Sequence, residues 1–231
     1  MLQNKFALSA INHLVATAAW LYSSYDVIAP ITFIATALAV WIVVTTLVDL
    51  AAKVTIHKTL GEGFKRLGLS YWAMVLGHVG LAFVIAGVTL TSAYSVERDV
   101  SMKPGDTVAL NEYKYRFDGV KSIRGANYSG HAGVVTVLKN DKQVTVLHAE
   151  KRRYDIGMQF MTEAAVDAGF TRDLYLALGE QLSQGAWSLR IYHKPYVRWM
   201  WLGGILISLA GFLVLGDKRY RQKSTKQEAS A

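Results

Sequence analysis

Four apolar stretches, each close to the thickness of a lipid bilayer, constrain this chain more than any other feature. They cover about residues 6–22, 30–50, 69–93 and 197–215. A helix needs roughly 20 mostly apolar residues to cross a membrane, and such a span satisfies its backbone polar groups internally. The sequence therefore predicts an α-helical membrane protein with about four spans. The first is the weakest, because Asn12 and His13 interrupt it.

The N-terminus leaves a second interpretation open. One lysine, an apolar stretch and small residues are also typical of a signal peptide. The interruption at Asn12 and the aromatic pair Trp20 and Tyr22, which suit a membrane interface, favour a plain first span.

Basic residues near the span ends predict the orientation, because Lys and Arg remain on the cytoplasmic side. They gather in a loop at 51–68 and in the tail after the last span. The predicted organisation is three spans in 1–94, an extracytoplasmic domain in 95–196, and a last span with a cytoplasmic tail in 197–231. This organisation places the domain outside the cytoplasm.

The segment 95–196 has alternating apolar residues typical of β-strands. Val134–Leu138 and Val144–His148 flank KNDKQ, which is a hairpin signal. We expect a small antiparallel β-barrel or sandwich, with residues 161–180 less regular. Its 14 Lys and Arg nearly balance 12 Asp and Glu, so nothing indicates nucleic-acid binding.

The chain has no cysteine. This excludes a disulfide, an iron-sulfur cluster, thiolate-bound zinc and a thiol nucleophile within it. A metal would have to be held by His, Met or carboxylate groups.

His78 lies at the centre of the apolar run 71–87, between Gly77 and Gly80. Ionisable groups inside a span are costly and usually face a partner, a cavity or a cofactor. In one explanation the glycines pack against another helix and a neutral His78 is hydrogen-bonded to a polar group. In the other, His78 is an axial haem ligand. The other histidine in a span, His13, is near a span end whereas His78 is roughly 15 Å along its helix, so a second ligand would come from another chain.

Three long strings of residues carry a resemblance to a known family. They are SYWAMVLGHVGLAFVIAGVTLTSAYSVERDVSMKPGD, AEKRRYDIGMQFMTEAAVDAGFTRDLYLALGE and WSLRIYHKPYVRWMWLGGILISLAGFLVLGDKRYR. From about Ser70 to Arg221 the chain resembles the C-terminal third of CcmF, the haem lyase subunit of bacterial system I cytochrome c maturation. The resemblance implies that His78, in GHVG, is an axial ligand of an intramembrane haem b and that Gly77 and Gly80 border this haem.

The same resemblance implies the reaction and the partners. In the family's reaction, a haem chaperone delivers a second haem. The intramembrane haem b reduces this delivered haem, with quinol as the candidate electron donor. The CxxCH thiols of apocytochrome c then become covalently attached to the delivered haem. The expected partners are an N-terminal CcmF portion, the haem chaperone, thiol-handling maturation subunits, apocytochrome c and membrane lipid. The tryptophan-rich segment and the other histidines of the family have no counterpart here, so we expect a split or truncated form that is inactive alone.

Two alternatives to this function stay open. One is a non-catalytic membrane scaffold that recruits maturation partners through its periplasmic domain. The other is the paralogous subunit of a specialised nitrite-reductase haem lyase.

The remaining ionisable residues have simpler expected uses. His131, His148 and His193 are expected to be surface or interfacial side chains and His57 a solvated one. A carboxylate-rich group is expected to form salt bridges or a docking surface rather than an acid/base site; its members are Glu163, Asp167, Arg172, Asp173 and Glu180. The basic run 151–153 is expected to be a solvated strand end, although it could also steer haem propionates or an acidic partner.

Overall fold

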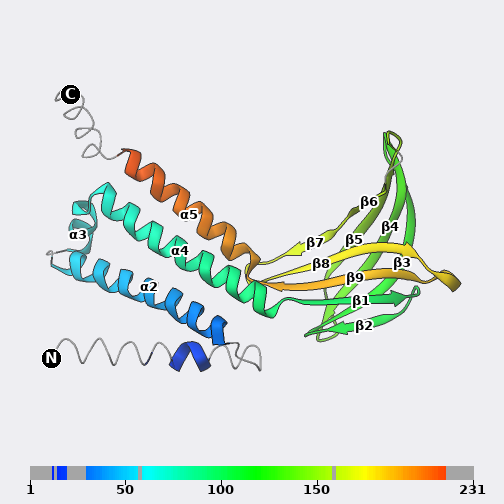
Figure 1. Cartoon of the computed structure of the whole chain (residues 1–231), viewed down its shortest axis with the longest axis horizontal. Coiled ribbons are helices and arrows are strands. Elements are labelled where there is room, and N and C mark those ends of the chain that lie inside the picture. The colour runs from blue at the N-terminus through cyan, green and yellow to red at the C-terminus, as the bar shows by residue number, and fades with distance from the viewer. Residues whose placement is uncertain (1–11, 13–14, 20–29, 57–58, 158–159, 217–231) are drawn as a thin grey trace. The chain divides into compact units, whose positions relative to one another are not determined.

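The structure, a computed structural model, describes residues 12, 15–19, 30–56, 59–157 and 160–216 (Figure 1). Its chain divides into two compact units. One comprises Met1–Ala93 with Tyr196–Ala231, and the other comprises Tyr94–Pro195. Most of the predicted first span, His13 and His57 lie outside the described residues.

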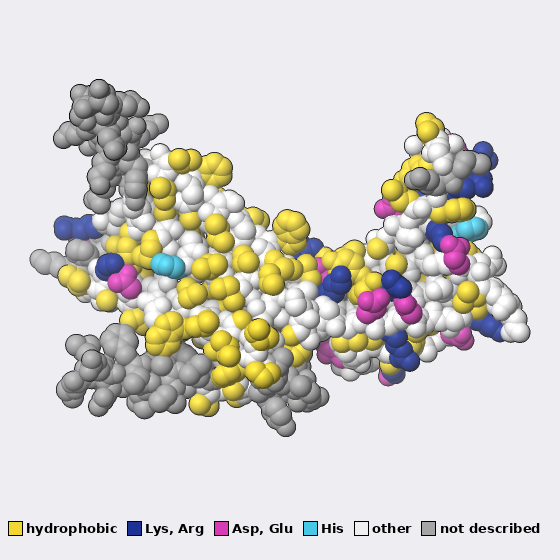
Figure 2. Space-filling model, viewed as in Figure 1, with side chains coloured by type: hydrophobic (Ala, Val, Ile, Leu, Met, Phe, Trp, Pro, Cys, Tyr) yellow, Lys and Arg dark blue, Asp and Glu magenta, His cyan; other side chains and the backbone are white. Residues whose placement is uncertain are grey.

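Three long apolar helices make up most of the described part of the first unit. They are α2 (Pro30–Thr55), α4 (Leu69–Tyr94) and α5 (Val197–Gly216), and each is long and apolar enough to cross a membrane. The prediction of helical spans is confirmed for these three. Figure 2 shows hydrophobic side chains spread over this unit, as lipid contact requires.

A short helix, α3 (Leu60–Arg66), connects α2 to α4. The hydroxyl of Thr59 accepts a hydrogen bond from the backbone N–H of Glu62 at 3.3 Å, which caps its first turn. Phe64 of this helix stacks on Trp72 of α4 with ring centroids 5.9 Å apart. The basic loop is therefore partly ordered by an aromatic contact with the next span.

The second unit consists of two antiparallel sheets that share one core. Sheet A has the strand order β1-β9-β8-β7, and sheet B has the order β2-β3-β4-β5-β6. Sheet A contains β1 (Val96–Met102), β9 (Trp187–Pro195), β8 (Arg172–Gln181) and β7 (Ala165–Ala168). Sheet B contains β2 (Thr107–Leu110), β3 (Tyr113–Arg124), β4 (Tyr128–Lys139), β5 (Lys142–Tyr154) and β6 (Phe160–Glu163). The predicted antiparallel β domain is confirmed, as a sandwich.

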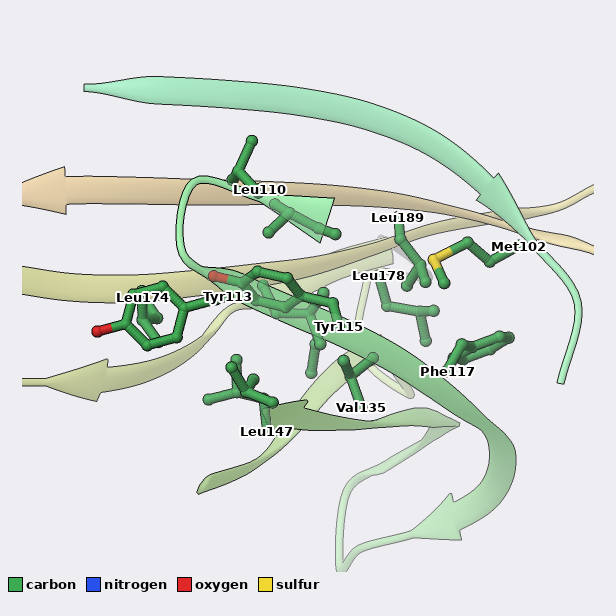
Figure 3. Close-up of a cluster of buried hydrophobic side chains, with 14 of the residues drawn as sticks. Met102, Leu110, Tyr113, Tyr115, Phe117, Val135, Leu147, Leu174, Leu178 and Leu189 are labelled. Atoms are coloured by element: carbon green, nitrogen blue, oxygen red, sulfur yellow. The ribbon is translucent and has the colours of Figure 1, made fainter. Parts of the chain in front are cut away.

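Alternating side chains of both sheets fill the space between them (Figure 3). Tyr115 and Phe117 of β3 and Leu178 and Leu189 of β8 and β9 are 0% exposed. Strands β8 and β9 bury every second residue over most of their length, and β3 does so from Tyr113 to Phe117. The period of two in the sequence therefore corresponds to one buried and one exposed face.

Two tight turns explain features of the sequence. Asn140 and Asp141 both have positive φ, 51° and 58°, and connect β4 to β5 in the two-residue turn geometry favoured by hairpins. The predicted KNDKQ hairpin is thus confirmed. The apolar residues are even-numbered up to Leu110 and odd-numbered from Tyr113 onwards. A turn explains this change, because Asn111, with φ 51°, lies in the connection between β2 and β3.

The region expected to be less regular contains three strands, β6, β7 and β8. Two of them have only four residues, and β6 is exposed along most of its length. Such short segments leave no alternating pattern to detect in the sequence.

Candidate functional site

Helix α4 has three faces with different neighbours, and its sequence explains each one. A strip of glycines contacts α5, a strip containing Ala82 and Ala86 faces α2, and the third strip contains His78. Residues on one helix face recur every three or four positions. Since the glycine strip and the alanine strip take up two faces of α4, His78 lies on the third.

The glycine strip fits closely against α5. A Cβ added at Gly80 would lie 2.9 Å from the carbonyl oxygen of Gly203, and one added at Gly203 would lie 2.5 Å from that of Gly80. A Cβ at Gly87 would lie 2.8 Å from the backbone nitrogen of Met200. The two backbones can approach this closely only because small residues face each other.

The alanine strip lines a cavity of about 380 Å³, whose wall also contains residues of α2, Ala16 and Thr17, and Trp199 of α5. Ala82 is 3% exposed and Ala86 is 6% exposed, and Val40 and Val43 of α2 line the other side. Ala82 is one turn after His78 on the same helix. The structure separates the two, since Ala82 faces α2 whereas His78 is exposed.

His78 lies on the strip of α4 that neither α2 nor α5 covers. It is the tenth residue of α4, so it is roughly 14 Å along the helix from its start, at 1.5 Å per residue. Its side chain is exposed, and so are those of Leu81 (43%) and Val88 (46%) on the same strip. Within the part of the chain that the structure describes, this face of a predicted membrane span therefore has no helix against it.

Met74, one turn before His78, is the nearest polar contact of the imidazole. Its Sδ lies 3.1 Å from Nδ1 of His78. In the tautomer whose Nδ1 carries the hydrogen, this nitrogen donates to the thioether and the lone pair is on Nε2. A neutral imidazole oriented in this way can bind a metal through Nε2.

The two glycines beside His78 have different surroundings from the imidazole. Gly80 contacts α5, as described above, and a Cβ at Gly77 would lie 3.8 Å from Cβ of Ala210. Helix packing accounts for these contacts, as the first of the two sequence-based explanations expected. That Gly77 and Gly80 also border a haem stays a prediction.

A polar contact between α2 and α4 escaped the sequence analysis. Tyr71 donates its hydroxyl to Oδ2 of Asp49 at 2.7 Å, and Nζ of Lys53 donates to the same oxygen at 2.8 Å. Lys53 also lies over the Tyr71 ring, 4.2 Å from its centroid. An acidic residue near the end of an otherwise apolar run was the available signal, since such residues usually have a partner.

The histidines of the sandwich have ordinary structural surroundings. His131 packs on Trp187 with ring centroids 5.3 Å apart, and His148 is exposed. His193 packs on Tyr113 at 6.0 Å, and burial lowers the pKa of its imidazole below the usual 6.5. Among the described residues no three His, Cys, Asp or Glu side chains converge as metal ligands.

The carboxylate-rich group forms separate contacts rather than one site, as expected. Asp167 accepts from Arg172, Glu180 from Lys151, and Glu163 lies 3.9 Å from Arg152. Asp173 is 4% exposed and accepts from the backbone N–H of Gly169. Carboxylates that are bound to a basic side chain or to the backbone in this way stabilise loops and strands. They do not face one another across a cleft, as two carboxylates in acid/base catalysis would.

The comparisons with known proteins agree with this architecture. Residues 93–195 match the family described as CcmF C-terminal beta-sandwich. Over 211 residues, 91% of the chain, the sequence is 44% identical to the cytochrome c-type biogenesis protein CcmF of Escherichia coli (strain K12), and the match covers 31% of that protein. The corresponding protein of Pseudomonas aeruginosa is 47% identical over 80% of the chain and 28% of its own length.

Two further similarities were found. NrfE of Haemophilus influenzae, also named a cytochrome c-type biogenesis protein, is 31% identical over 71% of the chain and 26% of its own length. A solved structure, "Cytochrome c Heme Lyase CcmF", matches in fold with a TM-score of 0.72 at 13% identity, over 90% of this chain and 34% of that one.

The fold and the comparisons define a membrane-spanning protein with an antiparallel β-sandwich between two of its spans. The chain belongs to the CcmF family and corresponds to the C-terminal part of its members, as its resemblance implied. It spans about 31% of the length of the curated Escherichia coli relative.

Proposed function

We propose that this chain is a component of a cytochrome c haem lyase in which His78 holds one side of an intramembrane b-type haem. The observation that carries the proposal is the place of His78, exposed at mid-span on the uncovered face of α4. An imidazole facing lipid alone would be unfavourable. A partner that covers this face and uses the imidazole removes that cost.

The donor chemistry of this face fits one axial position of a haem. Nε2 of His78 is available as a ligand when Nδ1 donates to Met74. Leu81 and Val88, which share the strip, offer exposed apolar contacts for a macrocycle. When bound, such a haem supplies one-electron redox chemistry, with quinol as the candidate donor. Gly77 and Gly80 stay secondary candidates for contact with its edge.

The second axial ligand comes, in this proposal, from the N-terminal CcmF portion or another CcmF chain. The curated relatives extend over about three times the length matched here, so the uncovered face of α4 has a natural covering partner. The substrate is a haem delivered by a chaperone. Its vinyl groups receive the CxxCH thiols of apocytochrome c once its iron is ferrous, and thiol-handling subunits keep those thiols reduced.

A spectrum of the purified complex tests the assignment. The chain is produced with its N-terminal CcmF portion, and reduced-minus-oxidised spectra are recorded for wild type, His78→Ala and Leu81→Ala. Loss of the b-type signal in His78→Ala with retention in Leu81→Ala is the expected result. A signal that survives His78→Ala unchanged, with the complex intact, would favour the alternative of a non-catalytic scaffold and remove the proposed ligand.

The other candidate that the sequence left open is a subunit of a specialised nitrite-reductase haem lyase. Both candidates use the same haem site and differ in the apocytochrome that is matured. Complementation of strains lacking either lyase would separate them.

We further propose that the spans lie in the bacterial inner membrane with the sandwich in the periplasm. The positive-inside rule supports this, because Lys53, Lys65 and Arg66 are all near the α2–α4 connection. The chain has no cysteine, so single cysteines at Glu62 and Lys142 can be labelled in intact cells with a membrane-impermeant maleimide. Labelling of Lys142→Cys but not of Glu62→Cys is expected, and the reverse pattern would invert the topology.

A further inference from the structure

The inner face of sheet B continues beyond the end of sheet A. On this face, His131 of β4 packs on Trp187, the first residue of β9, and Lys151 of β5 pairs with Glu180 near the end of β8. The next row of sheet B is Arg124, Ser129, Arg153 and Phe160. Figure 1 shows β4 and β5 extending past the strands of sheet A at this end. We call these two rows the arginine shelf.

The strand register places the shelf residues on one face. Ser129 pairs with Arg124 on one side and with Arg153 on the other, and Arg153 pairs with Phe160. Between β4 and β5 no register shift separates Ser129 from the core residue Val135, and on β3 the shift at Phe117/Gly119 is followed by an unbroken register down to Arg124 and Ser129. Because alternate residues of a strand share a face, the side chains of the shelf continue the face that elsewhere packs against sheet A.

The shelf changes the chemistry of this face from apolar to basic. Most basic groups nearby have a carboxylate partner, including Lys151 with Glu180 and Arg152 with Glu150. Arg124 and Arg153, both exposed, have no ion pair among the residues that the structure describes. They flank Ser129 across two strand spacings, or roughly 10 Å. Two uncompensated guanidinium groups therefore lie in one row.

An exposed aromatic side chain completes the row. Phe160 is 67% exposed, and Nζ of Lys151 lies 5.8 Å from its ring centroid. Met161 beside it is 55% exposed. Figure 2 shows hydrophobic and basic side chains gathered together at this end of the sandwich. Arginine and aromatic residues are the types that dominate binding energy at protein interfaces.

We propose that the arginine shelf is a docking surface for an acidic polypeptide segment of a partner protein. Carboxylates of that segment pair with Arg124 and Arg153, and an apolar side chain covers Phe160. Charge complementarity selects an anionic partner. The spacing within the shelf favours a polypeptide over a lipid headgroup, because an extended segment can present two carboxylates roughly 10 Å apart to Arg124 and Arg153, whereas one headgroup presents a single phosphate.

Peptide binding to the full chain in phosphatidylcholine nanodiscs tests the proposal. The probe is a fluorescein-labelled octaglutamate peptide, and a second probe carries one leucine among the glutamates. Binding by fluorescence anisotropy is expected to weaken about tenfold in Arg124→Gln/Arg153→Gln, as the loss of two exposed ion pairs, and to weaken with added salt. The leucine probe is expected to bind more tightly, and Phe160→Ala to remove that gain.

Two controls make the result decisive. Lys121→Gln/Lys142→Gln removes the same charge from outside the shelf and is expected to change the Kd less than twofold. Arg124→Lys/Arg153→Lys keeps the charge and is expected to restore most of the binding. Equal binding by wild type and Arg124→Gln/Arg153→Gln overturns the proposal, as does an equal loss in the Lys121/Lys142 control. Binding of the shelf to phosphatidylglycerol vesicles without binding to either peptide assigns it to lipid instead.

Discussion

The hydroxyl of Tyr115 offers a direct test of the packing argument for the sandwich. Tyr115 is 0% exposed, and no hydrogen-bond partner lies within reach of its oxygen among the residues that the structure describes. Burial raises the pKa of this phenol far above its usual value of 10. We therefore expect Tyr115→Phe to stabilise the domain, because it removes a polar group that folding takes out of water uncompensated.

The expected magnitude follows from two opposing terms. An unsatisfied buried hydroxyl costs about 1–3 kcal/mol. The void left by one oxygen, about 15 Å³ at about 24 cal/mol per Å³, costs only about 0.4 kcal/mol. The net gain is about 1 kcal/mol, which corresponds to a rise in Tm of about 4–8 °C for a domain of this size.

Tyr113→Phe is the matched control, because the Tyr113 oxygen accepts a hydrogen bond from Nε of Arg172 at 3.2 Å. Loss of a hydrogen bond to a charged donor is expected to destabilise the domain by about 1–2 kcal/mol. Scanning fluorimetry in one detergent gives Tm for both variants, and hydrogen exchange of β3 amides reports the domain alone. A fall in Tm for Tyr115→Phe as large as that for Tyr113→Phe would refute the reasoning.

Two further predictions concern the other features described above. In the cysteine-free chain, Gly77→Cys and Ala210→Cys should form a disulfide on oxidation, since a Cβ at Gly77 would lie about 3.8 Å from that of Ala210. Gel mobility reports this cross-link. Gly203→Leu should abolish it, whereas Gly204→Leu, with open space around the residue, should leave it intact. Burial lowers the pKa of His193 below 6.5 in the folded state. As the pH is lowered through about 6.5, the unfolded state therefore binds a proton that the folded state does not, and the free energy of unfolding decreases. Tm measured from pH 7.5 to 5.5 should therefore fall less in His193→Leu than in wild type, and identical slopes would contradict this.

Several parts of the fold could be predicted because their causes are local. The long apolar runs require membrane-spanning helices wherever they fall in the chain. The Asn140-Asp141 turn and the alternation along β9 report backbone geometry over a few residues. The position of His78 within an apolar run was visible for the same reason, and it remains the centre of the proposed function.

The surroundings of these residues depend on contacts between distant segments, which periodicity does not contain. Gly80 and Gly203 are far apart in the chain, and only their close approach decides that α5 covers the glycine strip and leaves His78 exposed. Likewise, all three residues of the basic run 151–153 carry a positive charge, so the sequence does not distinguish them. The strand register and the end of sheet A decide that Lys151 is paired with Glu180 while Arg153 joins Arg124 on an open face. The sequence determined which residues carry charge and which tolerate lipid, whereas tertiary packing decided which of them are left without a neighbour, because burial is a property of two surfaces and not of one.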